Sequence, residues 1–167
     1  PEAGSVGAVT DNGDGTYSAE FTAASLEQEL NVTITAEAPD YRVQDRETIF
    51  LDGKGPQITD VTGDTEGTTG EEVEVSVTAT DPTEPITAKI YVNGVEHDMS
   101  SVFARFTYRI QVPIDSVDPI NYYIVVSDGL GNETRAPETG SYTIAVSDND
   151  PPVAEAGPDQ TVELGRD

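Results

Sequence analysis

The feature that most constrains this chain is an alternation of apolar and polar residues. Between Val73 and Ala79 every second residue is apolar, and the residues between them are polar. A period of two places alternate side chains on opposite faces of a β-strand, whereas a helix needs an apolar repeat near 3.6. The alternation recurs in the segments Gln57–Val61, Glu71–Thr80, Ile86–Val92, Ala104–Val112, Ile120–Val126 and Ser141–Val146. The sequence therefore predicts an all-β fold.

The strand spacing favours an antiparallel β-sandwich of the immunoglobulin (Ig) type, because about 90 residues carry six strands separated by turn residues. Asn93 and Gly94 predict a tight hairpin, since both tolerate the positive φ that a type I′ turn requires. The alternation also predicts which side chains fill the core. These are Val73, Val75, Val77, Ile90, Val92, Phe106, Tyr108, Ile110, Tyr122, Ile124, Val126 and Ile144.

A repeated motif indicates tandem modules. Asp52 to Ile58 reads as Asp, three residues, Pro, and an apolar residue two positions on; Asp148 to Ala154 repeats the pattern 96 residues later. A period near one hundred residues is typical of sandwich arrays. We expect residues 1–52 to be the C-terminal part of a first Ig-like module, 53–148 a complete module, and 149–167 the first strand of a third. Because position 1 is Pro, we expect a segment of a longer chain.

Three stretches resemble known families. Asp150 to Gly165 resembles the opening strand of a PKD (polycystic-kidney-disease) domain. Asp11 to Thr22 resembles the late strands of bacterial invasin-type Ig-like repeats, and Ser127 to Thr134 resembles the last hairpin of bacterial and archaeal Ig-like repeats. These resemblances imply Ig-like, fibronectin III/PKD-like sandwiches without catalytic residues, in extracellular or cell-surface multidomain proteins. We therefore expect an extracellular chain that is not an enzyme.

The charge balance limits the partners. The chain has 32 Asp and Glu against 8 Lys and Arg, a net charge of −24. Such a field repels phosphate backbones and anionic lipid, so we expect no nucleic-acid partner. The short apolar runs predict no direct membrane insertion in this segment. The absence of cysteine excludes disulfides and thiolate zinc sites. The acidity fits adaptation to high salt and cation binding in an envelope layer equally well.

The linkers are the candidate metal sites. In an Ig-like topology Asp52, Asp81 and Asp128 meet at the leading end of the complete module, while Asp148 and Asp150 lie at its trailing end. Calcium takes six to eight oxygen ligands, and an interdomain joint can supply them from both sides. The sequence therefore predicts Ca²⁺ at module joints, as a ligand that the fold does not require. The alternative is solvated surface charge.

The segment Asp11 to Gly15 is predicted to be a turn and not a calcium loop. An EF-hand-type register would place Thr10 and Phe21 at the first and last ligand positions, where neither supplies a carboxylate. His97, between two acidic residues after the Asn93 hairpin, is expected to be exposed and not part of a catalytic triad.

Two sequons, Asn31-Val-Thr33 and Asn132-Glu-Thr134, are candidate glycosylation sites. Asn132 lies in a predicted exposed hairpin loop and is the favoured acceptor, whereas Asn31 lies at a strand start. Chance occurrence is the alternative for both.

Together these features predict a non-catalytic structural or adhesive spacer of a long extracellular protein: a stalk, an adhesin or an S-layer-like envelope component. The alternative is an accessory Ig/PKD module that presents a secreted hydrolase to polysaccharide or protein. The expected partners are other modules of the same chain, and neighbouring copies through unpaired terminal strands. We expect the segment Val153–Leu164 to pair with such a strand; the alternative is that it lies extended along the 53–148 module or in a lattice contact.

Overall fold

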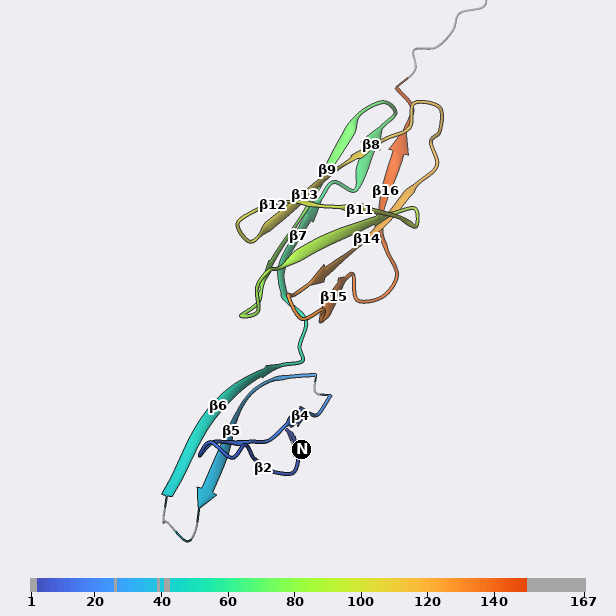
Figure 1. Ribbon diagram of the computed structural model, residues 1–167. Helices are drawn as coiled ribbons and strands as arrows, with labels where there is room; N and C mark the ends of the chain where they lie inside the picture. Colours follow the sequence, from blue (N-terminus) through green and yellow to red (C-terminus); the bar gives the residue numbers. More distant parts are fainter. Residues whose placement is uncertain (1–2, 26, 39, 41–42, 150–167) are drawn as a thin grey trace, which may run out of the picture.

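A computed structural model describes residues 3–25, 27–38, 40 and 43–149 of the 167-residue chain. The described residues form an all-β structure of strands joined by turns (Figure 1). No helix in this part of the chain has the length and apolarity needed to cross a membrane. Asp150 and the predicted pairing of Val153–Leu164 lie outside the described residues.

The N-terminal part consists of three two-stranded antiparallel pairs, in which β1 pairs with β4, β2 with β3, and β5 with β6. The strands are β1 (Gly4–Val6), β2 (Thr10–Asp11), β3 (Tyr17–Ser18), β4 (Phe21–Ala23), β5 (Glu29–Ala38) and β6 (Val43–Asp52). The turn between β2 and β3 is the predicted glycine-rich turn. Asp11 Oδ1 accepts a hydrogen bond from the Gly13 amide at 2.8 Å, and Asp14 Oδ1 accepts one from the Thr16 amide at 2.9 Å.

The central part is a sandwich of two sheets. The first sheet has the order β12-β13-β9-β7, and the second has the order β11-β10-β14-β16-β8 with β15 also paired to β14. The first sheet contains β7 (Gln57–Gly63), β9 (Glu72–Thr80), β12 (Ser100–Val102) and β13 (Arg105–Gln111). The second contains β8 (Glu66–Thr68), β10 (Thr87–Val92), β11 (Val95–Asp98), β14 (Ile120–Ser127), β15 (Glu133–Ala136) and β16 (Tyr142–Ser147).

The predicted core is confirmed. Ten of the twelve predicted side chains are buried, and the other two, Val92 and Tyr108, are partly buried and pack against them. Ile124 and Val75 are fully buried. The register is therefore the one that the alternation requires, since a shift by one residue would turn each of these side chains outward.

One strand pair departs from the predicted antiparallel arrangement. β8 runs parallel to β16, with Glu66 opposite Ala145 and Thr68 opposite Ser147. The three residues of β8 are too few to show an alternation, so the sequence pattern did not reveal this strand.

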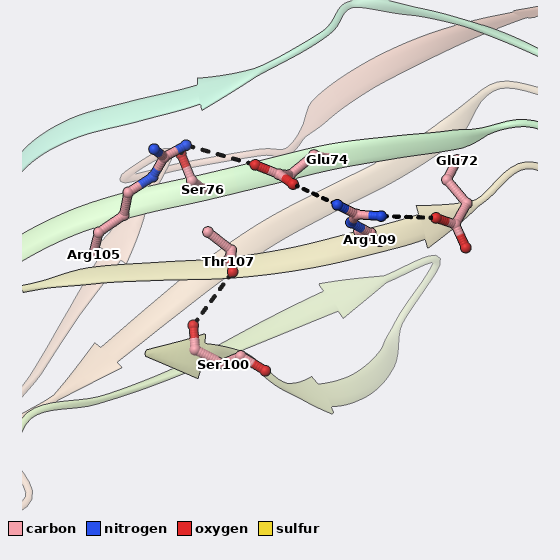
Figure 2. Close-up of polar contacts among 7 residues, drawn as sticks. All are labelled: Glu72, Glu74, Ser76, Ser100, Arg105, Thr107 and Arg109. Atoms are coloured by element: carbon pink, nitrogen blue, oxygen red, sulfur yellow. Dashed lines mark hydrogen bonds and ion pairs between the residues drawn. The ribbon is translucent and has the colours of Figure 1, made fainter. Parts of the chain in front are cut away.

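Charged residues cover the outer face of the first sheet (Figure 2). Arg109 on β13 lies opposite Glu74 on β9, with Nη2 3.4 Å from Glu74 Oε2, and its Nη1 is 3.5 Å from Glu72 Oε2. Arg105 Nη2 is 3.7 Å from Glu74 Oε1 and donates to Ser76 Oγ at 3.1 Å. Cross-strand pairs of opposite charge stabilise a sheet modestly. They keep this face polar while the core lies beneath it.

The hairpin between β10 and β11 is the predicted two-residue turn, with φ of 48° at Asn93 and 83° at Gly94. The prediction that His97 is exposed is wrong. His97 lies directly opposite Ile90, which is fully buried, so both side chains point to the same inner face. The His97 ring stacks on Tyr108 of the other sheet, with centroids 5.0 Å apart.

Candidate functional site

The candidate site lies where the chain passes from β6 into β7, at the lower end of the sandwich in Figure 1. The short linker there is held on both sides. Its Gly53 amide donates to Gln28 O at 3.2 Å, and the Lys54 ammonium is 4.0 Å from Glu29 Oε1. On the sandwich side, a Cβ on Gly55 would lie 2.4 Å from the carbonyl oxygen of Glu133, so only glycine fits. Pro56 is fully buried.

Three aspartates from separate strands meet at this joint. Asp52 ends β6, Asp81 follows β9, and Asp128 follows β14. One carboxylate oxygen of each lies within 4.8 Å of the others. Antiparallel pairing places Thr80, at the end of β9, opposite Gln57 at the start of β7, so the linker before β7 brings Asp52 next to Asp81. Asp128 follows β14 in the other sheet, and a hydrogen bond from Asn132 to the Asp52 backbone oxygen holds its loop against the linker.

Asp128 is the buried member of this aspartate cluster, with 6% of its surface exposed. Its Oδ1 accepts hydrogen bonds from the amides of Leu130 at 2.8 Å and Asn132 at 2.9 Å, and its Oδ2 accepts one from Asn132 Nδ2 at 2.7 Å. Burial by itself raises the pKa of this carboxyl, but hydrogen bonds from Asn132, Leu130 and Gly131 outweigh it, and the pKa of Asp128 is lowered. Asp128 is therefore held as a carboxylate.

Asp81 has the opposite environment. Asp81 is half-buried, and burial raises its pKa. The negative charges of Asp52 and Asp128 raise the pKa further. A hydrogen bond from the Thr83 amide to Asp81 Oδ1, at 2.8 Å, lowers it but does not offset these effects. Asp52 in turn accepts hydrogen bonds from the Lys54 amide at 3.1 Å and from the Thr83 hydroxyl. The cluster therefore concentrates negative charge that its protein neighbours balance incompletely.

The donor set of this cluster suits a hard divalent cation. It offers carboxylate oxygens only, and calcium prefers oxygen ligands at several positions. No ion pair among the described residues joins Asp52, Asp81 or Asp128 to a Lys or Arg. Each carboxylate has about four lone-pair sites, so the hydrogen bonds above leave capacity for a metal ligand. Asp52, Asp81 and Asp128 would hold such a cation, and it would cross-link the linker to two loops of the sandwich.

The structure separates the other predicted ligands from this cluster. Asp148 is exposed and follows β16, at the opposite end of the sandwich. Its neighbour Asn149 donates its amide to Thr69 Oγ1 at 2.9 Å. Three of the five predicted metal ligands therefore meet at one joint, Asp148 lies at the opposite end of the sandwich, and Asp150 lies outside the described residues.

Asn132 has a role at the joint that its sequence context did not predict. Its Nδ2 donates to Asp128 Oδ2 and, at 3.3 Å, to the backbone oxygen of Asp52. Asn132 is therefore half-buried between linker and sandwich, not exposed as expected. The spacing Asp128-x-x-x-Asn132 with Gly at 129 and 131 was the available signal, since Asp often accepts amides two residues on in such turns. Asn31, by contrast, is exposed on β5.

Comparison with known proteins adds no family. A scan against protein-family models finds no match to this chain, and a search of curated proteins finds none. The residues and geometry of the joint and the sandwich are therefore the basis for a function.

Proposed function

We propose that this chain is a non-catalytic spacer of a long extracellular surface protein, built from Ig-like modules in tandem and continuing into a PKD-like strand. The observation that carries the proposal is the path of the chain through the sandwich. The backbone enters at the end that holds Asp52 and leaves from β16 at the opposite end (Figure 1). A module traversed in this way adds its own length to an array.

The terminal strands are arranged to carry tension. β16 leaves the sandwich at its C-terminal end, and β8 runs parallel beside it. The amide of Ala145 donates to Thr65 O at 2.8 Å and the amide of Thr69 donates to Ser147 O at 2.9 Å. When the chain ends are pulled apart, β7 transmits the pull from the N-terminal side to β8. The pull from the C-terminal side acts on β16 in the opposite direction. The hydrogen bonds between β8 and β16 are then loaded together in shear instead of one at a time.

We also propose that Ca²⁺ binds the cluster of Asp52, Asp81 and Asp128 and stiffens the joint. Support comes from the three carboxylates within 4.8 Å of one another. The pKa of Asp81 is raised first by burial and then by the charges of Asp52 and Asp128, which is consistent with a site that a cation would neutralise. A bound cation stabilises the folded state in proportion to the logarithm of its concentration above Kd. We expect millimolar Ca²⁺ to raise Tm relative to chelator in the wild type, and not in Asp52→Asn.

The control for the calcium experiment is Asp115→Asn, which removes one exposed charge from a loop away from the joint. It should keep the full Ca²⁺ response. An equal Ca²⁺ response in Asp52→Asn and the wild type would reject the joint as the binding site.

The spacer proposal has a direct test in the native protein. A membrane-impermeant amine label applied to intact source cells should modify Lys54 and Lys89, both of which are exposed. Sequencing of the complete gene should show further repeats and an anchor. A catalytic domain on the same chain would favour the alternative, an accessory module of a secreted hydrolase. Labelling only after cell lysis would contradict both.

A further inference from the structure

We propose that Asn31, and not Asn132, carries an N-linked glycan in the folded protein. This inference depends on the proposed function, because glycan transfer requires passage through a secretory pathway. Both residues begin an Asn-x-Thr sequon. The structure distinguishes the two residues by the hydrogen bonds that each side-chain amide nitrogen donates.

Both hydrogens of the Asn132 side-chain amide are already used in hydrogen bonds. An Asn side chain has two N–H donors, and the Asn132 Nδ2 donates to both Asp128 Oδ2 and the backbone oxygen of Asp52. A glycosidic bond replaces one of these hydrogens with a sugar. A glycan at Asn132 is therefore incompatible with the closed joint.

The Asn31 amide faces open space. Asn31 and Thr33 are both exposed on β5 and share one face of the strand, while Leu30 and Val32 face the other way and are half-buried. The Thr33 hydroxyl lies near another exposed hydroxyl, that of Thr48, at 3.3 Å. A sugar on this face would displace no described hydrogen bond of the Asn31 side chain.

The residue opposite Asn31 is the second observation that favours a glycan. Asn31 pairs with Phe50 of β6, and Phe50 is 46% exposed on a face otherwise made of polar side chains. Cross-strand neighbours have Cβ atoms about 5 Å apart, within reach of the first sugar. The C–H face of a pyranose would cover the Phe50 ring and remove its apolar surface from water.

The transfer is a substitution at the anomeric carbon of a polyprenyl-phosphate-linked oligosaccharide. The Asn31 Nδ2 forms a bond to sugar C1 while the C1–O bond to the lipid phosphate breaks. The phosphate leaves with the bonding electron pair, and one Asn31 amide proton passes to a base of the oligosaccharyltransferase.

The test expresses residues 1–167 through a eukaryotic secretory pathway and maps glycans on the folded, secreted fraction by peptide mass spectrometry. We expect a glycan on Asn31 that is lost in Thr33→Ala and kept in Thr134→Ala. The matched pair removes each sequon while leaving both Asn side chains in place. A glycan on Asn132 in folded protein, or a bare Asn31 in secreted wild type, would overturn the proposal.

A further readout addresses Phe50. The glycosylated wild type should melt above Thr33→Ala, and that difference should shrink in a Phe50→Ser background. An undiminished difference would contradict the covering of Phe50. Failure of this inference is separable from failure of the spacer proposal, because surface labelling of intact source cells is independent of acceptor choice.

Discussion

Two substitutions of the same kind in the aspartate cluster should change stability in opposite directions. Asp128→Asn and Asp81→Asn each replace a carboxylate by an amide of nearly the same shape. Asp128 is held charged by three hydrogen bonds, whereas Asp81 is pushed toward its neutral form by burial and by Asp52 and Asp128. In chelator, Asp128→Asn should destabilise the sandwich and Asp81→Asn should stabilise it.

The contacts set the magnitudes. In Asp128→Asn one amide N–H₂ faces the Nδ2 donor of Asn132, so a charge-assisted hydrogen bond is lost and a donor is left unpaired, at a cost of about 1.5–3 kcal/mol. For a domain of this size that lowers Tm by about 10 °C. In Asp81→Asn the Thr83 amide keeps an oxygen acceptor. The substitution removes two like-charge pairs, with Asp52 and with Asp128, and each pair at this separation is worth about 1 kcal/mol at the dielectric of water.

The pH dependence follows from the two pKa directions. The pKa of Asp128 is lower folded than unfolded, so its contribution to stability is present above its unfolded pKa, about 3.9, and is lost as pH falls through the folded value. The pKa of Asp81 is higher in the folded state than in the unfolded state. Its contribution to stability is therefore fully present below the unfolded-state pKa and is lost as the pH rises through the folded-state pKa. The gain in Asp81→Asn should therefore appear near pH 7 and vanish in acid.

The assay is urea unfolding at pH 7 and pH 4 in chelator, followed by circular dichroism, with Asp115→Asn as the control for loss of an exposed charge. If both cluster variants shift the free energy of unfolding in the same direction, or if Asp128→Asn is neutral at pH 7, then Asp128 and Asp81 do not have the opposite environments described above.

Three further substitutions test the sandwich. Ile124→Ala removes a fully buried side chain and should cost about 2–5 kcal/mol in urea unfolding; a cost below 1 kcal/mol would contradict the core assignment. Phe103 is 99% exposed with φ of 55°, so Phe103→Gly should raise Tm by relieving about 1 kcal/mol of strain, and a lowered Tm would show that the ring has contacts of its own. Glu74→Gln removes the carboxylate shared by Arg105 and Arg109 and should cost at most about 1 kcal/mol, less in high salt.

Long alternating segments were predictable because each carries its own register. β9, β14 and their buried residues follow from period two alone, and the Asn93-Gly94 turn follows from its need for positive φ. The short strands were not predictable. β8, β12 and β15 have three or four residues each, which is too few to show a pattern. They form strands because they pair with longer strands that lie beside them in space.

The aspartate cluster was predictable in part. Strand order alone places the ends of β9 and β14 beside the linker, which gathers Asp52, Asp81 and Asp128. The burial of Asn132 was not predictable, since it depends on the Asp52 backbone oxygen, 80 positions away in the chain. The inward orientation of His97 similarly depends on its pairing with Ile90, which a local reading of charged neighbours does not reveal.

Single-molecule extension of the chain, held by its two ends, measures directly whether the sandwich bears force. We expect one force peak for the sandwich, with a released length on the order of 300 Å at about 3.3–3.6 Å per residue. Thr69→Pro removes the amide that donates to Ser147 O and should lower the peak force, whereas Thr69→Ser keeps that amide and a hydroxyl and should not. Gradual extension without a peak, or an equal peak in wild type and Thr69→Pro, would contradict a force-bearing spacer.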